Sequence, residues 1–193
     1  QSRFEKAKQL GFIPKNAKLN DVFPQFRKWD ELSKEEREVY ITDMAVMAGM
    51  LEAMDFHIGR YVDYLTKEGW MDNTIFIITS DNGPEGAEYH SAVMKWAKRQ
   101  GYHRDFDKYG SKGYYGATGP EFANAMASPF SYFKYYTGEG GLRVPFIMSG
   151  NNLPQNIQSD AFCFFTDIAP TIYDLVGLST SANEGYAPIT GKS

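Results

Sequence analysis

Cysteine, positive charge and long apolar runs are all scarce in this sequence. The single cysteine, Cys163, excludes an internal disulfide and a cysteine-rich zinc site. Twenty Lys and Arg against 24 Asp and Glu give a net charge of −4, which argues against a nucleic-acid-binding surface. The apolar runs are too short for a bilayer, so no membrane span is predicted.

The remaining composition is that of a globular protein. Hydrophobic residues make up 42% and charged residues 23% of 193 residues, which excludes a disordered chain. The aromatic share is high at 16%, and 18 glycines predict tight turns around packed rings. No positively charged, apolar leader follows Gln1, so any targeting signal is expected to be absent or already removed.

One long helix is predicted between residues 34 and 68. Ser33 and Glu36 form a capping box, and Gly69 can adopt the left-handed conformation that ends a helix. An apolar stripe follows helical spacing along it: Tyr40, Met44, Met47, Ala48, Leu51, Met54, Ile58, Val62 and Leu65. The four methionines of this helix are interpreted as core filling rather than as a partner-binding surface.

Short apolar segments predict strands after this helix. Residues 74–79 and 144–149 have the pattern of strands buried on both faces, as in a parallel sheet. A third strand is predicted at 160–165, and a helix at 167–176. This order of helices and strands is typical of an α/β fold.

Two segments lack a clear period. Residues 1–32 are expected to form an extended arm with short helical turns that packs its aromatic residues onto another surface. Residues 84–133 form a long loop, which is predicted to be a lid or pocket wall. It contains four candidate substrate-pocket residues, and aromatic rings among them would suit a sugar or aryl ring: His90, Trp96, Tyr114 and Tyr115.

Three positions outside this loop have side chains of chemical interest. Asp81 and Asn82 directly follow the first predicted strand, at the edge where α/β sheets bind ligands. Their oxygens suit Ca²⁺ or Mg²⁺, but Asp-Asn-Gly is also typical of a plain turn, and both interpretations stay open. Lys134 could bind an oxyanion or be a solvated surface lysine. Cys163 is expected to be buried and inert in a strand, and Arg143 to be a structural ion-pair residue.

Three motifs occur in a fixed order. Residues 72–83 read Asp-Asn-Thr-Ile-Phe-Ile-Ile-Thr-Ser-Asp-Asn-Gly, and residues 139–145, which follow Lys134, read Glu-Gly-Gly-Leu-Arg-Val-Pro. Residues 166–177 begin Thr-Asp-Ile-Ala-Pro-Thr. In order and spacing these motifs resemble the second part of the sulfatase catalytic domain, most closely that of bacterial arylsulfatases.

The resemblance implies a fold, a reaction and a set of site residues. The fold would be of the α/β alkaline-phosphatase type, a mostly parallel sheet flanked by helices. The reaction would be hydrolysis of aryl or sugar sulfate esters by a formylglycine made from Cys or Ser. Asp81 and Asn82 match two ligands of a metal, Ca²⁺ or Mg²⁺, and Lys134 matches a sulfate-binding lysine.

Part of the family pattern is missing from the sequence. The Cys-x-Pro-x-Arg modification motif does not occur, since Cys163 is followed by Phe-Phe-Thr. We therefore expect residues 1–193 to be a partial catalytic domain, without the N-terminal nucleophile-bearing part and the C-terminal subdomain. Alone it is expected to be inactive and to self-associate through exposed core surface.

Two alternatives to a sulfatase stay open. A phosphoesterase of the same superfamily would carry similar motifs, although Asn82 favours the single-metal sulfatase type. A noncatalytic module could keep the fold without the chemistry. By resemblance, the whole protein would be periplasmic or secreted, with a small sulfated substrate as its partner and no nucleic acid.

Overall fold

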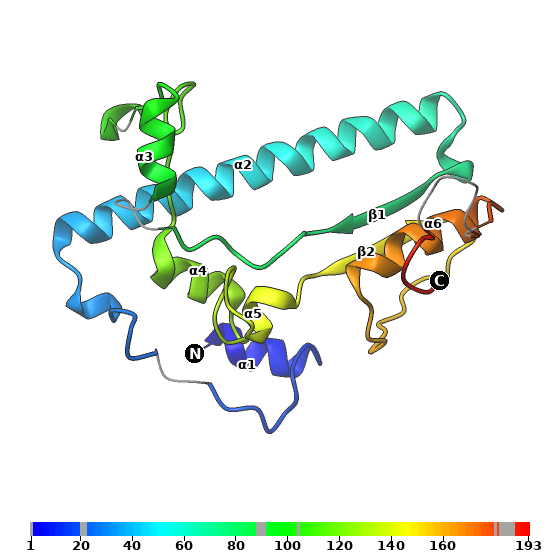
Figure 1. The fold of residues 1–193 in the computed structure, drawn as a ribbon, viewed down its shortest axis with the longest axis horizontal. Coiled ribbons are helices and arrows are strands. Elements are labelled where there is room, and N and C mark those ends of the chain that lie inside the picture. The colour runs from blue at the N-terminus through cyan, green and yellow to red at the C-terminus, as the bar shows by residue number, and fades with distance from the viewer. Residues whose placement is uncertain (1, 20–22, 88–91, 104, 180, 182–187) are drawn as a thin grey trace. The chain divides into compact units, whose positions relative to one another are not determined.

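The computed structural model describes residues 2–19, 23–87, 92–103, 105–179, 181 and 188–193 (Figure 1). The chain divides into two compact units, Gln1–Asn151 and Asn152–Ser193. In chain order, the first unit contains α1 (Ser2–Gln9), η1 (Trp29–Glu31), α2 (Lys34–Lys67), η2 (Met71–Asn73), β1 (Ile75–Thr79), α3 (Ala92–Arg99), η3 (Phe106–Lys108), α4 (Gly119–Ala127), α5 (Glu139–Leu142) and β2 (Phe146–Gly150). The second unit contains η4 (Phe165–Asp167) and α6 (Ile168–Leu175).

Helix α2 confirms the prediction of a long capped helix. The Ser33 hydroxyl accepts a hydrogen bond from the Glu36 amide at 3.1 Å, and the Glu36 carboxylate accepts one from the Ser33 amide at 2.9 Å. These bonds satisfy two amides that have no partner inside the helix. At the other end Gly69 has φ +72°, the left-handed conformation expected there.

The apolar stripe of α2 is only partly covered by the described part of the chain. Leu65 is buried, but Met50, Leu51 and Met54 are each more than half exposed. The interpretation of the methionines as core filling is therefore wrong for Met50 and Met54, whereas Met44 and Met47 are half-buried. Periodicity shows which face of a helix is apolar, but it does not show whether a partner for that face lies in the same chain.

Strands β1 and β2 form a two-stranded antiparallel sheet. Their register runs from Ile75 opposite Gly150 to Thr79 opposite Phe146. The mixture of helices and strands is confirmed, but the parallel pairing expected for these two strands is wrong. Burial on both faces is also wrong, since Ile75 and Phe146 are both exposed. An apolar run predicts a strand, whereas strand direction depends on a connection that the pattern does not encode.

No strand forms at residues 160–165, which were predicted to pair. This segment is irregular until η4 begins, and Cys163 within it is exposed rather than buried. The rings of Phe162 and Phe164 contact each other, with centroids 5.0 Å apart. Helix α6 follows as expected, and Gly177 after it has φ +70°.

The hydrophobic core of the first unit joins its N-terminal segment to α4 and the residues after it. Phe26, Ala123 and Phe133 are buried together, with Phe23 and Tyr132 packed against them. Phe23 stacks on Tyr132 with ring centroids 4.2 Å apart. The expectation that aromatic rings of residues 1–32 pack onto another surface is therefore met by Phe23 and Phe26, and that surface belongs to the same chain.

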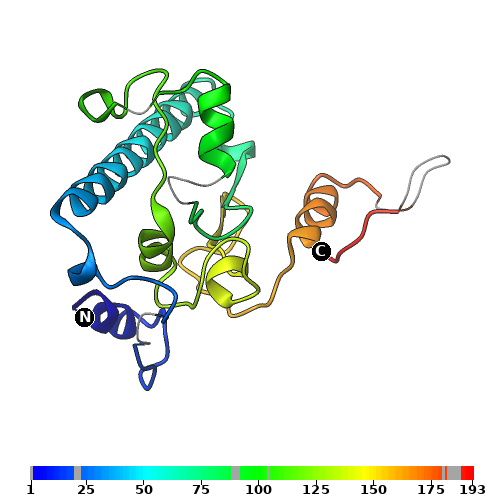
Figure 2. The same cartoon turned by 60° about the vertical axis from the view of Figure 1, so that its left-hand side comes forward.

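Helices α4 and α5 are neighbours in both views (Figures 1 and 2). The predicted long loop of residues 84–133 contains α3, η3 and α4, so much of it is helical.

None of the helices in the described ranges combines the length and the apolar character needed to cross a membrane.

Candidate functional site

The turn after β1 carries the two candidate metal ligands. Ser80 donates its hydroxyl to the carbonyl of Asn82 at 2.9 Å, and the Asn82 side-chain amide donates to the carbonyl of Gly83 at 2.9 Å. Asp81 is exposed and Asn82 is half-buried. The segment is thus a hydrogen-bonded polar turn, and an amide whose nitrogen is used in this way offers its oxygen to a ligand.

Three glycines pack this turn against α5. The Gly83 amide donates to the carbonyl of Gly141 at 3.0 Å. A Cβ atom on Gly83 would overlap the carbonyl oxygen of Gly140, so only glycine allows the two backbones to approach this closely. Gly140 in turn donates its amide to the carbonyl of Ser131 at 2.8 Å. Residues 80–85 and the segment around Lys134 are therefore held together through α5.

Lys134 is attached to the turn at two points. Its amide donates to the carbonyl of Pro84 at 3.0 Å, and its ammonium nitrogen lies 3.0 Å from a carboxylate oxygen of Glu85. The hydrogen bond and charge of Glu85 raise the pKa of Lys134, and the charge of Asp81 adds to this effect. The structure thus ties Lys134 to the two residues that follow the Asp81-Asn82-Gly83 turn.

Glu85 is a part of this site that the sequence analysis missed. Its Oε2 accepts hydrogen bonds from the Lys134 ammonium and from the Tyr135 hydroxyl, the latter at 3.1 Å. Its backbone carbonyl accepts a hydrogen bond from the Thr118 hydroxyl at 2.9 Å. The signal in the sequence is slight, because Glu85 lies only four residues after Asp81 but 49 residues before Lys134.

The described residues supply part of a metal site. Asp81 and Asn82 provide carboxylate and amide oxygens, the hard ligands that Ca²⁺ and Mg²⁺ prefer. No group of three or more His, Cys, Asp or Glu that could hold a metal ion exists within the described ranges. Because Ca²⁺ takes about six to eight oxygen ligands, these two residues fit the ion chemically but require further ligands.

The candidate substrate-pocket residues lie on other parts of the first unit. Trp96 is half exposed on α3, Tyr114 contacts His103, and Tyr115 contacts Tyr102. His90 lies outside the described residues. Substrate contact by these four residues stays a prediction, because the described contacts of the two tyrosines are with neighbours in their own loop.

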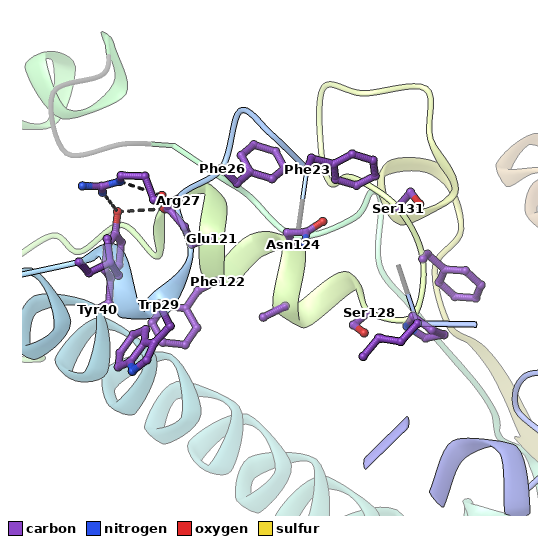
Figure 3. A pocket seen from close by; sticks show the side chains of 15 residues that line it. Phe23, Phe26, Arg27, Trp29, Tyr40, Glu121, Phe122, Asn124, Ser128 and Ser131 are labelled. Atoms are coloured by element: carbon purple, nitrogen blue, oxygen red, sulfur yellow. Dashed lines mark hydrogen bonds and ion pairs between the residues drawn. The ribbon is translucent and has the colours of Figure 1, made fainter. Parts of the chain in front are cut away.

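A cavity of about 320 Å³ lies elsewhere, beside α4 (Figure 3). It is lined mainly by rings and small side chains from the N-terminal segment and from the chain after α4. None of the predicted site residues within the described ranges lines it. Its polar lining includes Arg27, Tyr40 and Glu121.

The polar side of this cavity is a cluster of one cation and two carboxylates. Arg27 lies 3.2 Å from the carboxylate of Glu121 (Figure 3). It also lies 2.6 Å from the carboxylate of Glu36. The Tyr40 hydroxyl donates to Glu121 at 3.1 Å, and burial together with the charge of Glu121 raises the pKa of Tyr40 to about 12. With both carboxylates engaged by Arg27, the cluster ties the N-terminal segment to α2 and α4.

The chain is similar in sequence to known proteins of one family. A profile of the sulfatase family matches residues 14–178. An uncharacterized sulfatase of Schizosaccharomyces pombe is 36% identical over 179 residues, which are 91% of this chain and 32% of that protein. An arylsulfatase of Klebsiella aerogenes is 27% identical over 193 residues, covering 98% of this chain and 41% of that protein. The chain thus spans less than half the length of either relative, and it belongs to the sulfatase family.

Proposed function

We propose that this chain forms part of the active site of a sulfatase that hydrolyses aryl or sugar sulfate esters. Asp81 and Asn82 would hold a divalent cation, Ca²⁺ or Mg²⁺, and Lys134 would bind the sulfate group. The observation that carries the proposal is the packing of Gly83 against α5, which brings a strand-end Asp-Asn pair and a partly exposed lysine into one site. The family membership of the chain supports the same reaction.

The residues of the site have charges that suit this reaction. Hydrolysis of a sulfate ester places negative charge on the sulfuryl oxygens and on the leaving oxygen. A bound cation would stabilise that charge as a Lewis acid. The Lys134 ammonium would do the same at close range, because its raised pKa keeps it protonated and its side chain is 32% exposed.

We further propose that the chain is one part of a longer catalytic domain. The alkaline-phosphatase-like α/β fold of the family needs more strands than β1 and β2, and the remaining metal ligands would come from the same missing polypeptide. The formylglycine nucleophile would also lie in that part. The exposed apolar side chains of α2 support this proposal, since Met50, Leu51 and Met54 would gain a covering surface.

The test of the site uses the full-length protein. We expect Lys134→Ala to lower kcat/KM for an aryl sulfate by about 100-fold, because one charged hydrogen-bond donor to the transition state is lost. Asp81→Asn is expected to raise the Ca²⁺ concentration that gives half-maximal activity. Glu38→Gln is the control, because it removes the charge of an exposed carboxylate paired with Lys34 on the surface of α2.

Two outcomes would contradict the proposal. If the full-length protein turns over an aryl phosphate but not an aryl sulfate, the chain is part of a phosphoesterase. If neither ester is turned over, a noncatalytic module is the better interpretation.

The partial-domain proposal has its own test. The 193-residue chain, purified alone, is expected to show no aryl sulfate turnover and to self-associate in sedimentation velocity experiments. Turnover by this chain alone would refute the proposal that the nucleophile lies outside it.

A further inference from the structure

We propose that Glu85 is the positioning residue of Lys134, which holds the ammonium group where it can bind sulfate. The inference rests on the proposed function of Lys134, but it concerns a residue to which neither that function nor the family match assigns a role. Its basis is the contact between the two side chains, 3.0 Å from ammonium nitrogen to carboxylate oxygen.

The first argument is the two-point attachment of Lys134. A lysine side chain is long and flexible, so an ammonium group without a partner samples many positions. In this site the Lys134 amide is bound to Pro84 and the ammonium is bound to the next residue, Glu85. The backbone and the ammonium group of Lys134 are thus both held by Pro84 and Glu85, two and three residues after Asn82.

The second argument is that Glu85 is itself held. Its Oε2 also accepts the Tyr135 hydroxyl, and its backbone carbonyl accepts the Thr118 hydroxyl. Its Oε1 is buried. The Lys134–Glu85 ion pair is therefore unlike the surface pair of Lys34 and Glu38 on α2. The side chains of that surface pair are 85% and 63% exposed, and their charged groups are 3.9 Å apart.

The third argument is the donor capacity that remains. An ammonium group has three N–H donors, and the bond to Glu85 uses one of them. Two donors are left for the oxygens of a sulfate. Glu85 therefore orients the Lys134 ammonium group and leaves two of its N–H donors for a ligand.

The backbone around Lys134 gives independent support. Tyr132 and Tyr135 have φ of +68° and +77°, a left-handed conformation that residues with bulky side chains rarely adopt. Such conformations persist where the surroundings hold them, and they are frequent at functional sites. The ring of Tyr132 is held in a stack between Phe23 and Tyr136.

A double-mutant cycle in the full-length, Ca²⁺-loaded protein tests the proposal. The variants are Glu85→Ala, Lys134→Ala and the combination of both, assayed with para-nitrophenyl sulfate. We expect Glu85→Ala alone to lower kcat/KM by about tenfold, the effect of losing a charge-assisted hydrogen bond. In the Lys134→Ala background the same change should alter kcat/KM by less than about twofold, because residues that act through one contact are not additive. Glu38→Gln serves as the control for loss of an exposed carboxylate charge.

Tyr135→Phe covers the case in which Glu85→Ala does not fold. It removes only the hydroxyl that binds Glu85 and keeps the ring, whose centroid lies 5.3 Å from the Lys134 ammonium. We expect a loss of about threefold in kcat/KM that also disappears in the Lys134→Ala background.

The outcomes separate this inference from the proposed function. If Lys134→Ala impairs turnover but neither Glu85→Ala nor Tyr135→Phe does, the inference is wrong and the proposed function stands. Equal losses with and without Lys134 would show that Glu85 acts on the fold rather than through the lysine. If Lys134→Ala leaves turnover of the sulfate unchanged, the proposed role of Lys134 fails, and the inference fails with it.

Discussion

Substitution of Gly83 by alanine should separate the turn that carries Asp81 from α5. The new Cβ would overlap the carbonyl oxygen of Gly140, and the two backbones must move apart until an ordinary contact of at least 3.4 Å is restored. Such overpacking typically costs about 1–3 kcal/mol. The movement also weakens the hydrogen bond from the Gly83 amide to Gly141, worth about 1 kcal/mol.

The expected total is therefore about 2–4 kcal/mol of unfolding free energy. For a chain of this size, that corresponds to a fall of roughly 4–16 °C in the unfolding temperature. Thermal unfolding of the 193-residue chain, followed by circular dichroism, measures this fall. Gly59→Ala is the matched control, because a Cβ there meets no atom within 4 Å and α2 should gain about 0.5–1 kcal/mol.

Two results would refute the reasoning. An unchanged unfolding temperature for Gly83→Ala would mean that the backbones do not meet as described. An equal fall for Gly59→Ala would mean that any added methyl group destabilises the chain. In the full-length protein Gly83→Ala should also lower turnover of an aryl sulfate, since it displaces Asp81 from Lys134.

Three further predictions concern other parts of the chain. Cys163 is exposed, so it should react with a thiol reagent in the folded chain at a rate close to that in denaturant, and protection from the reagent would contradict its placement. Ser33→Ala should destabilise the chain by about 1 kcal/mol through loss of the α2 cap, as measured by urea unfolding, whereas Ser33→Asp should not. Hydrogen bonds from the amides of Phe164 and Lys192 lower the pKa of Asp167, so their stabilising effect is present above the unfolded-state pKa and is lost as pH falls through the folded-state value. Acid titration of Asp167→Asn by circular dichroism should show a smaller loss of stability in that range, and an identical titration would count against this contact.

Local patterns in the sequence predicted local structure well. The capping box at Ser33 and the helical spacing after it act within a few residues, so α2 begins and ends where expected. The position of β1 was predicted as well, but its antiparallel pairing with β2 was not, because the partner strand lies about 70 residues away along the chain. At the segment around Cys163 a strand was predicted but none forms. An aromatic-rich sequence without a partner strand does not form a sheet.

In the candidate site, too, residues in local motifs were predicted and residues that depend on distant contacts were not. Asp81, Asn82 and Lys134 were identified from the sequence because they stand beside recognisable motifs. Glu85 was missed because its importance comes from a contact with Lys134 that only the packing of the glycines creates. The cavity near Arg27 was missed for the same reason, since its lining combines three separate segments of the chain.

The pairing of β1 with β2 also has a consequence for how a complete domain would assemble. Each strand has an outer edge, whose backbone N–H and C=O groups face away from its partner. Two strands by themselves are marginally stable in water, and free edges are templates for further strands. We therefore expect the sheet to grow outward from this pair, so that protection of its amides from hydrogen exchange would appear only when neighbouring strands have joined.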